Sequence, residues 1–176
     1  MISMEELLAS MLNPPTTPRH IDPAVKSFCK SINPKIDPFI LATTPEDWSR
    51  ADCCHLNVQH YIRLNGETMV CGYRIWYLEK CYIEAERHAV WRSDYGSYRD
   101  VSFNVDGETS IVFVPDIPAN QNGLGENELT VVHFVDSRLE QFRPMLEQRA
   151  RNTVTMPDDM AWQTCQTYAD YKKAQT

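Results

Sequence analysis

Residues 81–101 have the sequence CYIEAERHAVWRSDYGSYRDV, and they carry the clearest structural signal in the chain. Two runs rich in β-branched and aromatic residues flank a short segment that contains Gly96, a pattern typical of a β-hairpin. The hairpin places His88 near the middle of its first strand and Asp100 near the start of its second strand. A histidine whose ring is oriented by an acid is the basis of acid–base catalysis beside a nucleophile.

A cysteine that can serve as this nucleophile lies upstream of the hairpin. Residues 52–64, DCCHLNVQHYIRL, predict a helix in which Cys54, Val58 and Ile62 recur every four residues on one apolar face. The free N–H groups and the dipole at a helix start favour a thiolate, the nucleophilic form of cysteine. Cys54 is therefore the predicted nucleophile, and Cys53, also in the first turn, is the alternative.

The face of the first hairpin strand that carries His88 is unusually polar. Strand alternation puts Glu84, Glu86 and His88 on one side, and a buried charge there would need a partner. A catalytic imidazole needs a group that holds its second nitrogen. Asp100 on the neighbouring strand is the predicted orienting acid. Glu86, two residues from His88 on the same strand, is the alternative.

The rest of the chain predicts an α+β fold. Composition and periodicity predict helices at 3–12, 22–29, 137–151 and 158–173 and strands at 69–77, 82–92, 98–105, 110–115 and 129–134. The first three strands fit an antiparallel meander. We expect Asp22 and Asp52 to be the N-caps of the helices that follow them. Residues 116–128 are expected to form an irregular loop.

The length of 176 residues suits one domain, 1–176. Within it we expect a proline-rich N-terminal arm at 1–50. A core at 51–135 would hold the cysteine helix and the meander. The C-terminal helices would occupy 136–176.

Composition disfavours several classes of function. A net charge of −7 argues against a nucleic-acid partner. No run approaches the roughly 18 apolar residues of a membrane span, and the acidic N-terminus does not resemble a secretory signal, so we expect no membrane partner and a cytoplasmic location. The six cysteines include no Cys-x-x-Cys pair. We therefore expect neither a metal site nor a cofactor.

Two segments resemble known cysteine enzymes. Residues 88–91, His-Ala-Val-Trp, followed by a glycine-containing turn and 98–101, Tyr-Arg-Asp-Val, resemble the His-Ala-Trp…Asp segment of the transglutaminase-like branch of the papain-like superfamily. Residues 52–58 are similar to the Asp-Cys-x-x-x-Val helix start of the NlpC/P60 peptidoglycan hydrolases. The likeness covers residues 52–103. The whole pattern also resembles small uncharacterised bacterial or phage proteins, which supplies no substrate.

The resemblance implies a papain-like core: an N-terminal helix, an antiparallel meander and flanking C-terminal helices. It implies a cysteine hydrolase or acyl transferase with the triad Cys54, His88 and Asp100. The substrate would be an amide, ester or thioester, including those of a protein or peptide. One alternative is a catalytically inactive papain-like interaction module that binds a protein partner. Another is a zinc-stabilised module built from Cys53, Cys54, His55 and His88, although adjacent cysteines chelate one tetrahedral ion awkwardly. The oligomeric state stays open.

Overall fold

The computed structural model describes residues 3–117, 130–151 and 156–175, and in them the predicted α+β class is confirmed. The helices are α1 (Met4–Ser10), α2 (Pro23–Ile32), α3 (Cys54–Asn65), the 3-10 helix η2 (Ser137–Phe142), α4 (Arg143–Arg151), α5 (Asp158–Thr164) and α6 (Tyr168–Ala174). The strands are β1 (Phe39–Ala42), β2 (Thr68–Leu78), β3 (Tyr82–Arg92), β4 (Tyr98–Arg99), β5 (Ser110–Pro115) and β6 (Thr130–Phe134). None of the helices in these ranges is long and apolar enough to cross a membrane.

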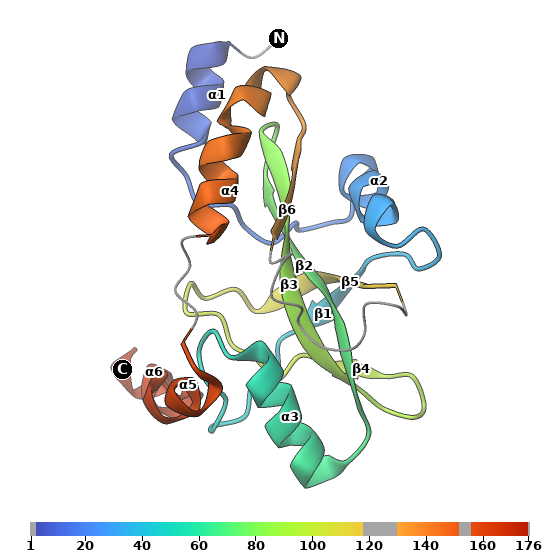
Figure 1. Ribbon diagram of the computed structural model, residues 1–176, viewed down its shortest axis with the longest axis vertical. Coiled ribbons are helices and arrows are strands. Elements are labelled where there is room, and N and C mark those ends of the chain that lie inside the picture. Colours follow the sequence, from blue (N-terminus) through green and yellow to red (C-terminus); the bar gives the residue numbers. More distant parts are fainter. Residues whose placement is uncertain (1–2, 118–129, 152–155, 176) are drawn as a thin grey trace.

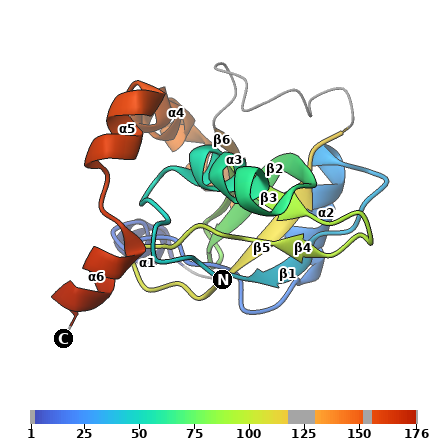
Figure 2. The ribbon, with the colours of Figure 1, turned by 90° about the horizontal axis from the view of Figure 1, so that it is seen from below.

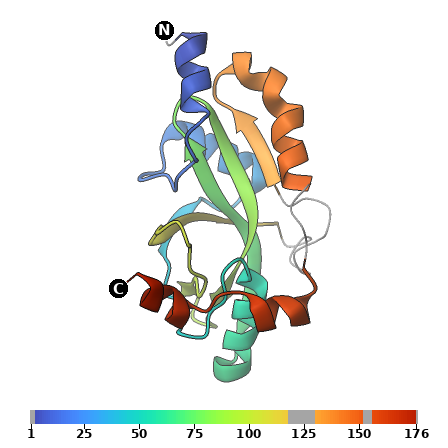
Figure 3. The ribbon, with the colours of Figure 1, turned by 90° about the vertical axis from the view of Figure 1, so that its left-hand side faces the viewer.

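The long hairpin of β2 and β3 is the backbone of the sheet. The two strands pair antiparallel along their whole length, from Thr68 opposite Arg92 to Leu78 opposite Tyr82. The strand order is β1-β5-β2-β3-β4, and β6 also pairs with β3. Helices gather at both ends of this hairpin: α1 and α4 lie near its turn, and α3, α5 and α6 lie near its open end (Figures 1 and 3).

Several sequence predictions need correction. The meander is only partly right, because β4 is two residues long and Asp100 follows it instead of lying within it. The proline-rich arm supplies the edge strand β1, which pairs with β5. The single helix predicted at 158–173 is two helices, because Cys165 adopts an extended backbone between them. Most of the predicted loop 116–128 lies outside the described residues.

Separate apolar clusters form along the hairpin, one at its turn and one in its middle. At the turn, Leu7 of α1 and Leu139 of η2 pack against Leu78 and Tyr82. In the middle, α2 covers β2, β3 and β5, and its N-cap is Asp22 as predicted, with the carboxylate accepting from Val25 N–H. Burial of these side chains, at about 25 cal/mol per Å² of apolar surface, is the main force that holds the helices on the sheet.

At the open end, α3 packs on β3. Val58 and Tyr61 of α3 contact Ala89 of β3 and Val101, which follows β4. The view from below shows α3 lying across the strands (Figure 2). The residue that begins α3, Cys54, belongs to the same cluster. Burial of the apolar face of α3 therefore brings the predicted nucleophile to β3.

Gly72 of β2 makes room for an aromatic ring beside His88. Gly72 lies opposite His88 in the sheet, and the ring of Phe113 occupies the space that a side chain would take. Phe113 meets the His88 ring edge to face, with centroids 6.4 Å apart at an interplanar angle of 70°. The absence of a side chain at position 72 is thus a condition for the packing around His88.

Gly72→Ala is expected to lower the free energy of unfolding by about 1–3 kcal/mol, the usual cost of overpacking a core. The new Cβ would lie 2.4 Å from the Val114 carbonyl oxygen and 2.6 Å from Cζ of Phe113, so backbone and ring must both move. Urea unfolding measures the change in the free energy of unfolding. Thr68→Ala, at the exposed end of the same strand, is the control and should stay within about 0.5 kcal/mol of the parent. Equal effects of the two substitutions would contradict this account.

Candidate active site

The start of α3 presents its N–H groups without a side-chain cap. The N-cap is Cys53, which makes no side-chain capping bond, and the first helical hydrogen bond runs from Asn57 N–H to the Cys53 carbonyl at 2.9 Å. The prediction that Asp52 is the N-cap is wrong, because Asp52 is exposed and has φ 55°. Half-buried Cys54 is the first helical residue. Its thiol therefore lies where the helix dipole and free donors favour negative charge.

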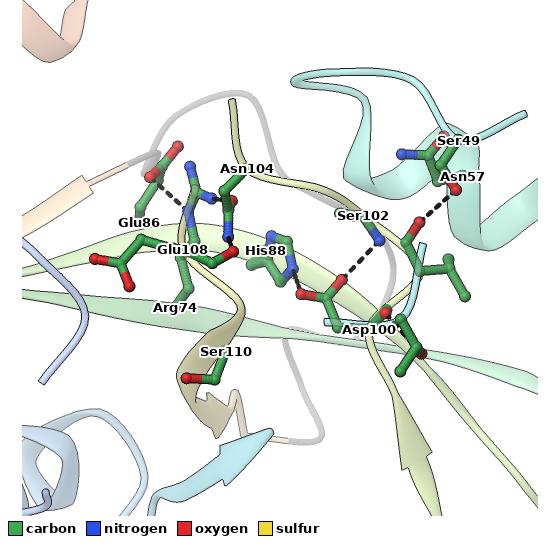
Figure 4. A network of polar contacts seen from close by, with 12 residues as sticks. Ser49, Asn57, Arg74, Glu86, His88, Asp100, Ser102, Asn104, Glu108 and Ser110 are labelled. Atoms are coloured by element: carbon green, nitrogen blue, oxygen red, sulfur yellow. Dashed lines mark hydrogen bonds and ion pairs between the residues drawn. The ribbon is translucent and has the colours of Figure 1, made fainter. Parts of the chain in front are cut away.

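Buried polar contacts hold the segment before α3. The Asn57 side chain is fully buried, accepts from Arg50 N–H at 2.7 Å and donates to the Arg50 carbonyl at 2.8 Å. The hydroxyl of Ser49, also fully buried, donates to the Val101 carbonyl at 2.6 Å (Figure 4). The chain segment that precedes Cys54 is thereby hydrogen-bonded to the segment that carries Asp100.

The outer edge of β3 is open beside this segment. β6 pairs with β3 only as far as Glu86, opposite Thr130. β4 pairs only from Trp91, opposite Arg99. In the described part of the chain no strand pairs with residues 88–90 on this edge. The gap leaves backbone groups of β3 available to a side chain.

The sulfur of Cys54 takes one of these groups. The Cys71 carbonyl accepts from Asp116 N–H at 3.0 Å, on the side of β2 away from β3. Ala89, opposite Cys71, is therefore in a non-hydrogen-bonded pair, and its N–H points out of the hairpin into the gap. There it donates to Cys54. The gap in strand pairing thus positions the thiol at the strand edge, next to His88.

His88 and Asp100 form a buried pair. Nε2 of His88 lies 3.3 Å from Oδ2 of Asp100, and the two residues are 3% and 1% exposed (Figure 4). Among the described residues neither atom makes a hydrogen bond, so the two meet as an ion pair. The second carboxylate oxygen of Asp100 accepts from Ser102 N–H at 2.9 Å, which fixes the carboxylate. Because Nε2 faces Asp100, Nδ1 is the nitrogen left for the side of Cys54.

The electrostatics of the site favour a thiolate beside an imidazolium. Burial would raise the pKa of Cys54, but the charge of His88 and hydrogen bonds from His55, His88 and Ala89 N–H lower it to about 6. Burial would lower the pKa of His88, but the charges of Asp100 and Cys54 raise it to about 10. Between these two values the pair carries opposite charges at close range.

A second histidine touches the thiol, and the sequence analysis considered it only as a zinc ligand. His55 forms a hydrogen bond with Cys54, and this contact raises the pKa of His55 despite its partial burial. Its Nε2 lies 3.1 Å from Oδ1 of Asp158 at the start of α5. No local sequence signal links His55 to Asp158, because the two residues are 103 positions apart. The thiol therefore has a buried imidazole–carboxylate pair and a more exposed one.

The alternative site residues are engaged elsewhere. Burial and a hydrogen bond with Cys165 raise the pKa of the Cys53 thiol to about 12, which disfavours its thiolate. Glu86 accepts from Arg74 Nε at 2.8 Å (Figure 4). It also accepts from Trp76 Nε1 at 2.6 Å. Neither residue is therefore placed as well as the one it would replace.

The four residues of the zinc alternative do not all face one point, although His55 and His88 both meet Cys54. Cys53 contacts Cys165, while Nε2 of His88 faces Asp100. Within residues 3–117, 130–151 and 156–175, no group of three His, Cys, Asp or Glu side chains is arranged to hold a metal ion.

A comparison of the chain with protein families, curated proteins and solved structures finds no match. The chemistry of this site is therefore argued from its own geometry.

The rate of alkylation of Cys54 by iodoacetamide is expected to follow a titration with a midpoint near pH 6, the pKa to which the site lowers this thiol. Below the midpoint the thiol is protonated and the rate falls, whereas above it the rate is flat through neutral pH. Peptide mass spectrometry of labelled protein across a pH series measures the rate at each cysteine.

Two variants test the cause of the low pKa. His88→Gln should move the midpoint up toward the ordinary thiol value of about 8.5, because the opposing charge is lost. His55→Gln removes one hydrogen bond and should move it less. A parent midpoint above pH 8, or no change in His88→Gln with the fold verified by circular dichroism, would contradict the ion pair.

Proposed function

We propose that the chain is a cysteine hydrolase or acyl transferase with a papain-like, transglutaminase-like core, acting on an amide, ester or thioester. The proposal depends on three groups that the fold brings together. The Cys54 thiol lies at a helix start without a side-chain cap and forms a hydrogen bond with His88. Nε2 of His88 lies 3.3 Å from Oδ2 of Asp100. Nucleophile, base and orienting acid are the three parts that nucleophilic acyl transfer requires.

In the first step the Cys54 thiolate attacks the substrate carbonyl carbon, and the electrons of the C=O bond move to its oxygen. The N–H groups of the first turn of α3 are free of a side-chain cap and can donate to this oxyanion. His88 gives its proton to the leaving amine, alcohol or thiol as the bond to carbon breaks. The product of this half-reaction is a thioester on Cys54.

In the second step an acceptor attacks the carbonyl carbon of the thioester. His88, now neutral, takes the proton of the attacking water or amine, and the thiolate leaves. Water makes the chain a hydrolase, and an amine makes it a transferase. The buried Asp100 carboxylate keeps Nε2 of His88 protonated, so that Nδ1 is the nitrogen that exchanges protons with the thiol and the leaving group.

His55 has a supporting role in the proposal. It lies on the more exposed side of the thiol, with Asp158 as its hydrogen-bond partner. Its contact with Cys54 stabilises the thiolate before attack. A reactive thiolate in a chain whose six cysteines are all free suits a reducing compartment, so we propose the cytoplasm as its location.

The direct test is to trap the acyl-enzyme. Incubation with p-nitrophenyl acetate should add one acetyl group to Cys54, detected by intact mass and peptide mass spectrometry, with release of p-nitrophenol. Cys54→Ser should abolish this adduct, and His88→Gln should slow its formation strongly. Acetylation that spares Cys54, or proceeds at the same rate without His88, would overturn the proposal and favour the inactive interaction module.

The orienting acid is tested by a matched pair of substitutions. Asp100→Asn should leave the fold intact but slow acylation, because an amide can donate to Nε2 and stabilise the wrong tautomer, an effect that reaches about 10⁴-fold in serine triads. Glu86→Gln removes the same charge from the face of β3 and should have a much smaller effect, because Glu86 is bonded to Arg74 and Trp76. A crippling Glu86→Gln beside a silent Asp100→Asn would reassign the acid.

A further inference from the structure

Two thiols that the proposed reaction does not use lie against each other beside the site. Cys53, directly before Cys54 and only 3% exposed, forms a side-chain hydrogen bond with Cys165. Cys165 is partly exposed and ends α5. Both pack in one apolar cluster with Leu56 and Ala161. The two thiols thus lie close together across the boundary between the start of α3 and the C-terminal segment.

Backbone contacts hold the two cysteines in this position. Ala51 N–H donates to the Gln166 carbonyl at 3.0 Å, and the adjacent residues Arg50 and Thr167 form an antiparallel bridge. The Arg50 guanidinium donates to the Trp162 carbonyl at 2.8 Å and lies over the Trp162 ring. The main chain before Cys53 is therefore paired with the main chain after Cys165, and the approach of the thiols does not depend on side-chain rotation alone.

We propose that Cys53 and Cys165 form a reversible disulfide when the protein meets a small-molecule disulfide such as oxidised glutathione. Cys165, the more exposed thiol, loses its proton and attacks one sulfur of the oxidant, whose S–S bond breaks and releases one thiol. Cys53 then loses its proton and attacks the Cys165 sulfur of the mixed disulfide, and a second thiol leaves. One S–S bond forms in the protein, one breaks in the oxidant, and the two electrons pass to the oxidant.

The same geometry makes the other thiols poor partners. Cys54 is engaged by His88 and by Ala89 N–H at the edge of β3. Cys29 is a fully buried residue of α2, and Cys81 is fully buried at the hairpin turn, each in a different apolar cluster. Cys71 is 1% exposed within β2. The disulfide within the protein is therefore expected to exclude Cys54, whose thiolate remains open to a glutathione adduct of its own.

The disulfide would join α5 covalently to the start of α3. The same helix carries Asp158, the partner of His55, at its first residue. Oxidation would thereby hold the exposed imidazole–carboxylate pair against Cys54 and resist separation of the C-terminal helices from the core. The proposal rests on the contact between the two thiols and not on the proposed acyl-transfer function.

The test uses the full chain incubated with oxidised glutathione, quenched with N-ethylmaleimide and digested with trypsin. The expected product is peptide 51–63 linked to peptide 152–172, reversed by dithiothreitol. Because peptide 51–63 holds both Cys53 and Cys54, variants assign the bond. Cys54→Ser should keep the link, whereas Cys53→Ser and Cys165→Ser should each lose it.

A thermal-unfolding measurement gives a second readout. Oxidation should raise the unfolding midpoint of the parent and of Cys54→Ser, and should leave Cys165→Ser unchanged, because only a cross-link restricts the unfolded chain. Cys165 is partly exposed, so this variant is expected to fold even where Cys53→Ser does not. A link that persists in Cys53→Ser, or a parent that gains only glutathione adducts, would overturn the proposal. Both of these outcomes would leave the proposed acylation of Cys54 untouched, because that reaction does not use Cys53 or Cys165.

Discussion

The candidate site depends on the incomplete pairing of the outer edge of β3. The inner edge of this strand is occupied by β2 along its whole length, whereas β6 and β4 leave residues 88–90 without a strand partner in the described part of the chain. An unpaired backbone donor away from water is costly unless something else accepts from it. The sulfur of Cys54 accepts from Ala89 N–H. The same gap therefore both requires a polar partner and provides the space for it.

Charge balance stabilises the groups around this gap. The Cys54 thiolate and the carboxylates of Asp100 and Glu86 face the imidazolium of His88 and the guanidinium of Arg74. The charges of Glu86, Cys54 and Asp100 raise the pKa of Arg74 against the effect of its burial. Neutralisation of one member weakens the electrostatic stabilisation of the others. The site is thus an electrostatic unit, and its members hold one another in their ionised forms.

Local patterns were sufficient for the elements that carry Cys54 and His88, but not for the segment that carries Asp100. The β-branched and aromatic runs predicted β3 and β5 with the bounds that the structure shows, and Asp22 with Pro23 predicted the start of α2. The cysteine helix was predicted, but its N-cap was not. Asp52 adopts φ 55°, and the N-cap is the next residue, Cys53. Capping depends on backbone angles, and the segment before this helix is held by hydrogen bonds between the Asn57 side chain and Arg50.

By itself, the sequence determined the residue types available for chemistry and the secondary structure that presents them. These are local properties: a cysteine in the first turn of a helix, a histidine within a strand and an acid beyond the next turn. Only the tertiary structure decided which of two adjacent cysteines meets His88 and which meets Cys165, because both lie in one turn and differ by the surfaces that pack around them. It also added β1 from the proline-rich arm to the sheet, and it brought Asp158 to His55 across 103 residues. Such contacts arise from burial of apolar surface by distant segments, and no local sequence pattern encodes them.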